Sequence, residues 1–306
     1  MTLPPRLRRL VTLAFVALAS ASCFAALKAG LEYAPPLRLV ALRLLIGGTT
    51  LLALLPVLGI RLLPHRGLWL WIVMLGVAVT AFAYGSMAIS LGYTGAGIAS
   101  VLGNSQPLLA VALGVWLFHE KLTLARLIAL LMGIAGVILV AYPVTSALQV
   151  EGGLGPLLAL ASSAGLVAAS VVVKHVGSGV SRLVLAAWPL VLGSIPLFLL
   201  SLALEPVNAT DWSPHFVGVL VFLAIPGTAL LTLGWYSLLR HEDLGRLSLY
   251  FYAVPAVGLV LSWFLYAEPI TGQEFGGVAL ILGSLVAVSF EEWRAEGSPK
   301  TSSTGS

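Results

Sequence analysis

Long apolar runs separated by short charged loops recur along the whole chain. Each run is close to twenty residues, the length of a helix that crosses about 30 Å of hydrocarbon. Transmembrane strands would instead alternate in polarity over about ten residues. The pattern therefore predicts an all-α integral membrane protein with ten transmembrane helices. The predicted spans are residues 10–30, 37–58, 68–91, 95–118, 124–142, 153–174, 182–203, 215–239, 245–266 and 274–290.

One stretch of this pattern occurs twice. Residues 97–140, shifted by 148 positions, meet residues 245–288 without a gap. Each half then holds five spans, and an odd number of spans inverts the second copy across the membrane. We expect two inverted five-helix repeats around a central cavity, residues 1–148 and 149–292, followed by a disordered cytoplasmic tail, 293–306. The coinciding pairs include Gly97 and Gly245, Ser100 and Ser248, Pro107 and Pro255, Glu120 and Glu268, and Thr123 and Thr271.

The Lys and Arg residues give the orientation. With the N-terminus inside, 13 of the 16 lie in inside segments, and only Lys28, Arg38 and Arg43 flank an outside loop. Because inside loops carry the excess of positive charge, both termini are predicted to be cytoplasmic.

Composition agrees with a membrane protein. The chain is 59% hydrophobic and 9% charged, with a mean hydropathy of +1.03, whereas soluble domains carry roughly a quarter charged residues. The pI of 9.4 does not indicate nucleic acid, because the positive charges lie at span ends rather than in one patch. The single cysteine, Cys23, excludes a disulfide framework.

The sequence contains no recognisable catalytic or metal-binding constellation. All twelve acidic residues fall in loops, tails or span ends. No Cys, His and carboxylate group has metal-ligand spacing, and no Gly-rich loop could cradle ATP phosphates. We therefore expect no enzyme, no cofactor and no metal. A receptor or scaffold would need a soluble domain or a long loop, and a channel would be distinguished by its conductance.

Polar side chains share one face of spans four and nine. Their i, i+4, i+7 spacing places them on one side of a helix, and the helical rise puts Asn104 about 14 Å and Tyr252 about 12 Å from opposite ends. Both faces therefore meet near mid-membrane, where inverted-repeat transporters bind substrate. The alternative is that these groups only bond neighbouring helices. The two faces are Ser100, Asn104 and Pro107, and Ser248, Tyr252 and Pro255.

Spans three and eight add aromatic side chains to this candidate site. Tyr84 and Trp235 could stack on a flat ligand or hold a cation, or could act as interfacial anchors. Pro107 also frees the carbonyl of Gly103 from its helical bond, for use by water or a substrate ammonium. Further candidate lining residues are Thr232, Ser163, Ser20, Ser22 and Ser170.

Three basic residues near span ends have two interpretations each. Arg43 lies about 9 Å inside span two. Outward snorkelling is favoured for it over pairing with a substrate carboxylate or a gating partner. Lys28 and Lys174 close spans one and six, and we expect them to anchor these ends rather than to gate.

Two carboxylates and two threonines are expected to be structural. Glu120 and Glu268 precede helix starts, where a carboxylate is stabilised. Thr123 is predicted to cap span five, and Thr271 with Glu274 forms a predicted capping box at span ten.

Spans five and ten hold almost no deep polar groups. Their small residues predict packing surfaces, so these helices are expected to serve as scaffold or as the contact of a homodimer. The residues are Gly133, Gly136, Gly276, Gly277 and Gly283.

The duplicated unit resembles the EamA repeat of the drug/metabolite transporter superfamily over about residues 10–290. The resemblance rests on G-x-x-S-x(6)-P, a Glu thirteen residues after the Pro, and a Gly-rich closing helix. His119 and Ala267 stand where the family usually has Gly before that Glu. The chain is most similar to bacterial amino-acid exporters, including the YddG-type exporters of aromatic amino acids. The family implies a basket of ten helices around a central cavity, with spans five and ten at the back.

These observations together favour a multi-pass exporter of amino acids, aromatic or broadly apolar, in the bacterial inner membrane. Its partners would be the lipid bilayer and a small-molecule substrate carried by alternating access. The neutral, partly aromatic cavity suits a zwitterion. The alternatives are a drug or quaternary-ammonium carrier and a nucleotide-sugar or phosphate-ester carrier. A phosphate carrier should show more membrane Lys or Arg than Arg43.

Overall fold

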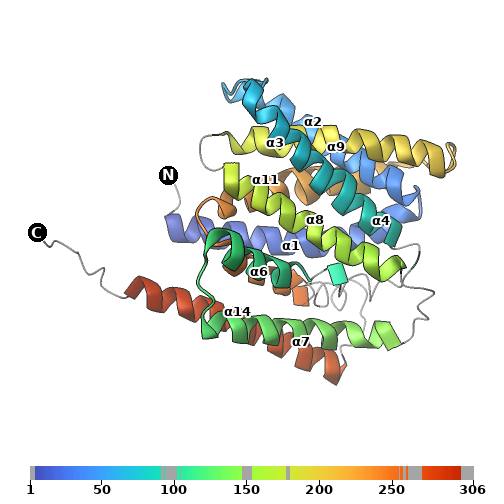
Figure 1. Ribbon diagram of the computed structural model, residues 1–306. Helices are drawn as coiled ribbons and strands as arrows, with labels where there is room; N and C mark the ends of the chain where they lie inside the picture. The colour runs from blue at the N-terminus through green and yellow to red at the C-terminus, as the bar shows by residue number, and fades with distance from the viewer. Residues whose placement is uncertain are drawn as a thin grey trace, which may run out of the picture.

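Helices make up all the regular structure in the part of the chain that the computed structural model describes, and no strand occurs there. The all-α fold expected from the apolar runs is thereby confirmed for these residues. The helices run side by side across the molecule, and the start of α1 and the end of α14 lie at the same end (Figure 1). The described residues are 4–90, 93, 102, 103, 105–146, 154–176, 180–254, 256, 257, 260 and 271–297.

The helical bounds agree to within a few residues for the second, third, sixth, seventh and eighth predicted spans, whereas parts of the fourth and ninth lie outside the described residues. The α-helices are α1 Pro5–Leu31, α2 Pro36–Val57, α3 Trp69–Leu75, α4 Gly85–Ser90, α6 Gln106–Phe118, α7 Leu124–Ser146, α8 Leu154–Val176, α9 Arg182–Leu204, α10 Pro214–Ala224, α11 Leu231–Leu239, α12 Leu244–Leu249 and α14 Gly272–Gly297. Short 3₁₀ turns are η1 Arg66–Leu68 and η5 Tyr250–Tyr252, and π segments are η2 Gly76–Tyr84 and η4 Ile225–Leu230.

Several of these helices are suited to a bilayer. Within the described residues, five helical stretches are long and apolar enough to cross a membrane. Shorter apolar helices cover parts of the fourth, fifth and tenth predicted spans. The five stretches are Pro36–Val57, Arg66–Ser90, Leu154–Val176, Arg182–Leu204 and Pro214–Leu239.

Two helix pairs form opposite sides of the molecule. α2 packs along α9 on one side, and α7 packs along α14 on the other, with α1, α6, α8 and α11 between them (Figure 1). The largest apolar cluster joins α2, α8, α9, α11 and α12. Apolar side chains also cover the outer surfaces, as expected where lipid rather than water is the solvent.

Each π segment interrupts a long span beside a glycine of the α2–α9 pair. η4 corresponds to residues 77–82 of η2 when the chain is shifted by 148 positions. A Cβ on Gly47 would lie only 2.6 Å from the Ala224 carbonyl oxygen, and a Cβ on Gly193 would collide with Thr80. Because π segments concentrate at functional sites, their matching positions direct attention to the surrounding side chains.

The α7–α14 pair uses its small residues internally. A Cβ on Gly136 would lie 2.7 Å from the carbonyl oxygen of Gly277, and one on Gly133 would enter the ring of Tyr252. These close approaches agree with the predicted packing surfaces. The homodimer through these helices stays a prediction.

The caps predicted for α7 and α14 are confirmed. The Arg126 N–H donates to Thr123 Oγ1 at 3.2 Å. At α14 the Thr271 N–H donates to Glu274 Oε2 at 2.7 Å and the Glu274 N–H donates to Thr271 Oγ1 at 3.3 Å. This reciprocal pattern is a capping box.

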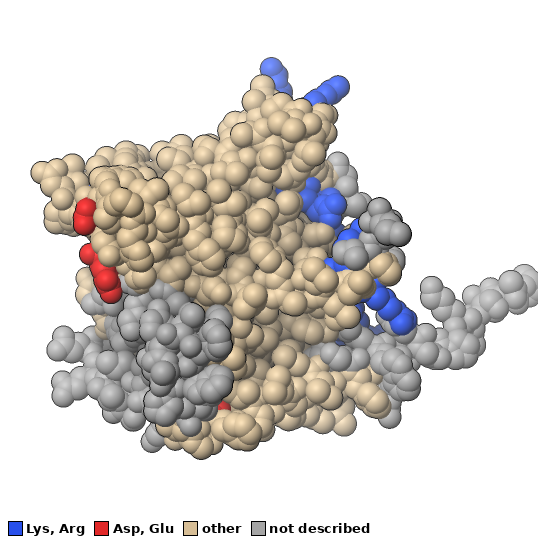
Figure 2. All heavy atoms as spheres, turned by 180° about the vertical axis from the view of Figure 1, so that it is seen from behind, with Lys and Arg blue, Asp and Glu red and all other residues tan. Residues whose placement is uncertain are grey.

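On the face that Figure 2 shows, the charged side chains are unevenly distributed along the helix direction. Figure 2 shows Lys and Arg side chains toward one end of the helices and Asp and Glu side chains mainly toward the other. We call the end that holds Arg9, Lys174 and Arg246 the basic end, and the end that holds Glu32 and Glu205 the acidic end.

Candidate functional site

Arg43 is a cation in the interior of the helix bundle. It is 5% exposed, its Nε donates to Thr228 Oγ1 at 3.0 Å, and its Cζ lies 5.2 Å from the centroid of the Tyr84 ring. Thr228 faces Gly47, one turn further along α2 than Arg43. The guanidinium therefore points into the bundle, which corrects the expectation that it snorkels outward.

Thr228 is itself fixed in place. Its hydroxyl donates to the Leu223 carbonyl at 2.8 Å across the π segment η4. The hydroxyl proton is thereby used, so its lone pair faces the Arg43 N–H. The wide turn of η4 thus presents a single acceptor to the guanidinium.

No acidic residue of the described chain lies within ion-pair distance of Arg43. Glu205, at the acidic end, is occupied elsewhere, since its two carboxylate oxygens accept the N–H groups of Leu37 and Arg38 at 2.7 and 3.0 Å. Arg43 brings one positive charge to this place. Its charge is therefore met in this structure by one hydroxyl and one aromatic face.

The equivalent place in the second half of the chain has no cation. Thr80 is the counterpart of Thr228 at the 148-position offset, and its Oγ1 donates to the Pro189 carbonyl at 3.1 Å. Pro189 stands four residues before the glycine that faces Thr80, just as Arg43 stands four residues before the glycine that faces Thr228. One half thus presents a guanidinium where the other presents a backbone carbonyl.

Trp235 and Ser170, two candidates from different spans, are in contact. The indole N–H of Trp235 donates to Ser170 Oγ at 3.1 Å, and the Ser170 hydroxyl donates to the Leu166 carbonyl at 3.0 Å. The Trp235 ring lies 4.5 Å from that of Phe251, tilted by 54°. Thr232, one turn before Trp235, is buried nearby on α11.

Ser163 holds α8 to the fourth predicted span. Its hydroxyl lies 2.8 Å from the carbonyl oxygens of both Leu102 and Gly103. Pro107 deprives the Gly103 carbonyl of its usual helical partner, and Ser163 replaces that partner. The carbonyl that we expected to be open to a ligand is therefore satisfied within the protein.

Tyr252 lies against the α7–α14 pair in this structure, and Ser248 bonds within α12. Ser248 Oγ donates to the Gly245 carbonyl at 2.7 Å. Tyr252 is 1% exposed, and its ring packs on Gly133. Tyr252 belongs to the short 3₁₀ turn η5, and its ring is covered by α7 in this conformation.

Part of the predicted site lies outside the described residues. Ser100, Asn104, Pro255 and Glu268 are among these, and nothing is described of the Lys28 side chain. The meeting of Asn104 with Tyr252 therefore stays a prediction.

A second constellation, which the sequence did not reveal, lies at the basic end. Lys174 Nζ lies 2.5 Å from Glu120 Oε1, and the same carboxylate accepts the N–H groups of Leu244 and Gly245 at 2.6 and 2.9 Å. Lys174, expected to be a simple anchor, thus has a buried partner. Glu120 does lie at a helix N-terminus, but at that of α12 rather than α7.

Neighbouring charges extend this contact. Glu242 accepts bonds from Arg9 and Arg246, and Arg126 donates to Asp243 at 2.5 Å. Burial alone would raise the pKa of the Asp243 carboxyl, but the bond and charge of Arg126, with the charges of Arg246 and Lys174, hold that pKa below its usual range. We call this group the ionic cluster. It consists of Arg9, Glu120, Arg126, Lys174, Glu242, Asp243 and Arg246.

His119 forms the turn that leads from α6 to Glu120 of the ionic cluster. It is left-handed, with φ 53° and ψ 34°, and the turn lets the Glu120 N–H donate to the Gly114 carbonyl at 3.1 Å. A glycine adopts this conformation without the steric penalty of a Cβ. The conformation gives a physical reason for glycine at this position, where the chain has His119.

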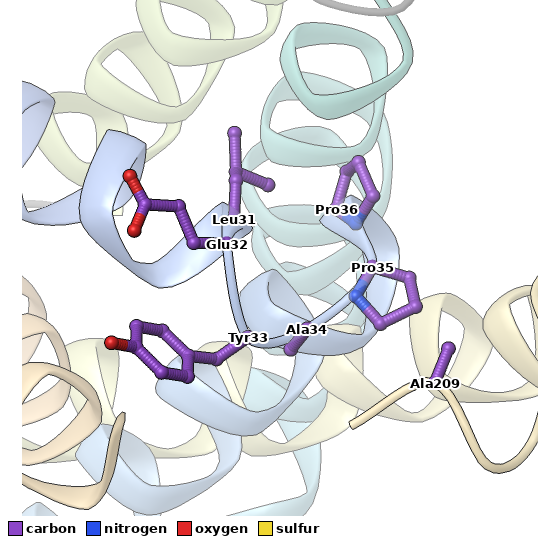
Figure 3. A pocket seen from close by; sticks show the side chains of 7 residues that line it. All are labelled: Leu31, Glu32, Tyr33, Ala34, Pro35, Pro36 and Ala209. Atoms are coloured by element: carbon purple, nitrogen blue, oxygen red, sulfur yellow. The ribbon is translucent and has the colours of Figure 1, made fainter. Parts of the chain in front are cut away.

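An open pocket lies at the acidic end, with a volume of about 360 Å³. Figure 3 shows it between the turn that joins α1 to α2 and the segment around Ala209, with Pro35 on one side and Glu32 and Tyr33 on the other. Its lining has one carboxylate and no basic side chain. It therefore offers no charge complement to an anion.

Within the described residues, no group of three or more His, Cys, Asp or Glu side chains could hold a metal ion. The candidate chemistry there rests on the buried cation, hydroxyls and aromatic rings.

Comparison with known proteins places this geometry in context. The sequence pattern of the EamA-like transporter family matches the chain twice, over residues 8–142 and 153–290. YvbV of Bacillus subtilis, named as an uncharacterized transporter, is 30% identical over 290 residues, covering 93% of this chain and 92% of that protein.

Two other relatives have more specific names. A probable amino-acid metabolite efflux pump of Salmonella typhimurium is 28% identical over 274 residues, covering 86% of this chain and 88% of that one. The protein of the same name from Escherichia coli is 27% identical over 282 residues, with coverages of 89% and 91%.

One solved crystal structure is similar in fold. It superposes with a TM-score of 0.80 at 21% identity and covers 93% of this chain and 97% of that one. At this identity the likeness concerns the fold alone.

Proposed function

We propose that the chain, which belongs to the EamA-like transporter family, is a ten-span inner-membrane secondary transporter that exports amino acids by alternating access. The observation that carries this proposal is the double match to the family, once over residues 8–142 and again over 153–290. Two copies of a five-span unit would be inverted relative to each other, and inverted repeats provide two mirror-related states, each open to one face.

Amino acids are the proposed substrates for two reasons. Two relatives are named as probable amino-acid metabolite efflux pumps. The bundle interior also offers one guanidinium at Arg43 together with aromatic rings at Tyr84 and Trp235. A zwitterion with an apolar or aromatic side chain fits this combination. A phosphate ester or a nucleotide sugar carries more negative charge than a single arginine would balance.

The basic end is the proposed cytoplasmic end. Lys and Arg gather there (Figure 2), and cytoplasmic segments carry this excess in bacterial membrane proteins. Both termini would then be cytoplasmic. The ionic cluster ties α1, α7, α8 and α12 together at this end, so it would hold the cytoplasmic side closed in this conformation.

Uptake into proteoliposomes tests the proposal. Vesicles that contain the full purified chain would be offered labelled phenylalanine, threonine, a nucleotide sugar and a quaternary-ammonium drug, with and without a proton gradient. We expect saturable phenylalanine flux above that of empty vesicles. Amino-acid flux no greater than in empty vesicles would refute the proposal, and saturable flux of the nucleotide sugar or of the drug would replace it with one of the alternatives.

Two substitutions test the predicted lining residues. Asn104→Ala and Tyr252→Ala should each lower the flux per folded transporter. Unchanged flux in both variants would remove these residues from the substrate site.

A further inference from the structure

We infer that Arg43 is the oxyanion receptor of this transporter and binds the carboxylate of the carried amino acid. The inference rests on the proposed function for its choice of a carboxylate. The observation beneath it is a guanidinium that is 95% buried and has no carboxylate partner in the described part of the chain.

The chain's own sequence does not provide a counter-charge at this depth. All twelve acidic residues lie in loops, tails or span ends, whereas Arg43 is seven residues inside α2, roughly 10 Å by helical rise. A lone charge in the low-dielectric part of a membrane protein is costly to maintain. A ligand that brings a negative charge would offset this cost. The charge of the site therefore favours anions, whatever the shape of the ligand.

The contacts of Arg43 orient it without neutralising it. The bond from Nε to Thr228 fixes one edge of the planar guanidinium, and the Tyr84 ring covers a face. The remaining N–H groups form a fork that matches the two oxygens of a carboxylate. Tyr84 therefore positions Arg43 and also presents an aromatic surface beside the bound group.

The comparison between the two halves shows that the cation is not required by the packing. Thr80 meets the Pro189 carbonyl at the place where Thr228 meets Arg43. The matching threonine–glycine contact thus exists in the other half with a carbonyl in place of the charge. The arginine is an addition to one half, in agreement with a role in binding rather than in holding α2 to the π segment.

The experiment compares the purified full-length wild type with Arg43→Gln and Arg43→Lys in proteoliposomes. The probes are phenylalanine, its amide, which lacks the carboxylate charge, and phenyl phosphate, a phosphate ester. Arg61→Gln, which changes an exposed arginine at the end of span two, is the matched control. Thermal unfolding in detergent establishes that each variant is folded.

We expect Arg43→Gln to raise the half-saturating concentration of phenylalanine roughly 10- to 100-fold, the loss typical of a hydrogen bond to a charged group. Transport of the amide should change less than threefold, and Arg43→Lys should recover part of the loss. Arg61→Gln should match the wild type. Thr228→Val, which keeps the shape but releases the guanidinium edge, should weaken phenylalanine binding by a smaller factor and tests the inference where Arg43→Gln does not fold.

The outcomes separate the two proposals. Phenylalanine flux that Arg43→Gln and Thr228→Val leave unchanged would overturn the inference and leave amino-acid export standing. Arg43-dependent flux of phenyl phosphate without amino-acid flux would retain the oxyanion receptor and overturn amino-acid export. If Arg43→Gln changes the flux of none of the probes, the assignment of Arg43 as an oxyanion receptor is wrong.

Discussion

The ion pair between Lys174 and Glu120 can be tested by a double-mutant cycle. Glu120→Gln removes the carboxylate charge and keeps the side-chain shape, and Lys174→Met removes the ammonium and keeps the apolar stem. The pair joins α8 to the loop after α6 with its atoms 2.5 Å apart, and the Glu120 and Lys174 side chains are 4% and 20% exposed. The cycle measures the coupling free energy of the two charges, which is the part of the free energy of unfolding that requires both of them.

The magnitude follows from the geometry. At an effective dielectric constant of about 20, two unit charges at this separation attract by about 7 kcal/mol before desolvation. Desolvation cancels most of this gain, and the partly exposed Lys174 is screened. The two N–H groups from the α12 N-terminus already stabilise the carboxylate in part. We therefore expect a coupling free energy of about 1.5 to 3 kcal/mol, as for close charge pairs in protein interfaces.

The assay is equilibrium unfolding in mixed micelles, followed by tryptophan fluorescence, for the wild type, both single variants and the double variant. Lys121→Met provides the control, since Lys121 is exposed and adjacent in sequence to Glu120. Its effect should add to that of Glu120→Gln within about 0.5 kcal/mol. A coupling below about 0.5 kcal/mol for the Lys174 pair would refute the reasoning that the two charges stabilise each other across the bundle.

Four further substitutions follow from the same structure. His119→Gly should raise the free energy of unfolding by up to about 1 kcal/mol in the same assay, because it relieves a left-handed Cβ, and a loss would contradict the strain. Tyr252→Phe should be neutral or stabilising by about 1 kcal/mol, since the buried Tyr252 hydroxyl has no hydrogen-bond partner in the described chain; a large loss would reveal a partner. Gly133→Ala should destabilise by roughly 1–3 kcal/mol, because the added Cβ enters the Tyr252 ring, and no loss would mean that the ring moves freely. Asp243→Asn should lower thermal stability at pH 7. Because the folded pKa of Asp243 lies below the usual 3.8, the wild type should stay more stable than the variant down to about pH 4 and lose this difference as the pH falls further. A stability difference that persists at lower pH would contradict this ionisation.

Local sequence rules predicted the features that depend on neighbours in the chain. The bounds of the five long apolar stretches followed from apolar run length, and the capping box at Thr271 followed from its spacing to Glu274. The free carbonyl acceptor at Gly103 was also predicted, because proline removes the N–H that would bond the residue four positions earlier. The donor that bonds this carbonyl, Ser163, was not predicted, since it lies 60 positions away.

Features that depend on packing were not predictable. The sequence placed Arg43 within the second span but did not give the direction of its side chain, which is set by Thr228, 185 positions later. The partner of Lys174 depends on a loop and a helix start that meet only in the folded bundle. The packing of the Tyr252 ring on Gly133 brings together residues that are far apart in the chain, and the two π segments have no local signature beyond Gly and Pro.

The exchange of an arginine for a proline between the two halves bears on the transport cycle. If the halves exchange shapes when the carrier reorients, the solute meets a guanidinium on α2 but never an equivalent one on α9. A solute that one state binds more tightly shifts the population toward that state. The two faces of the membrane should therefore show different half-saturating concentrations for the same amino acid. This kinetic asymmetry between the two faces would arise from one residue within an otherwise symmetric scaffold.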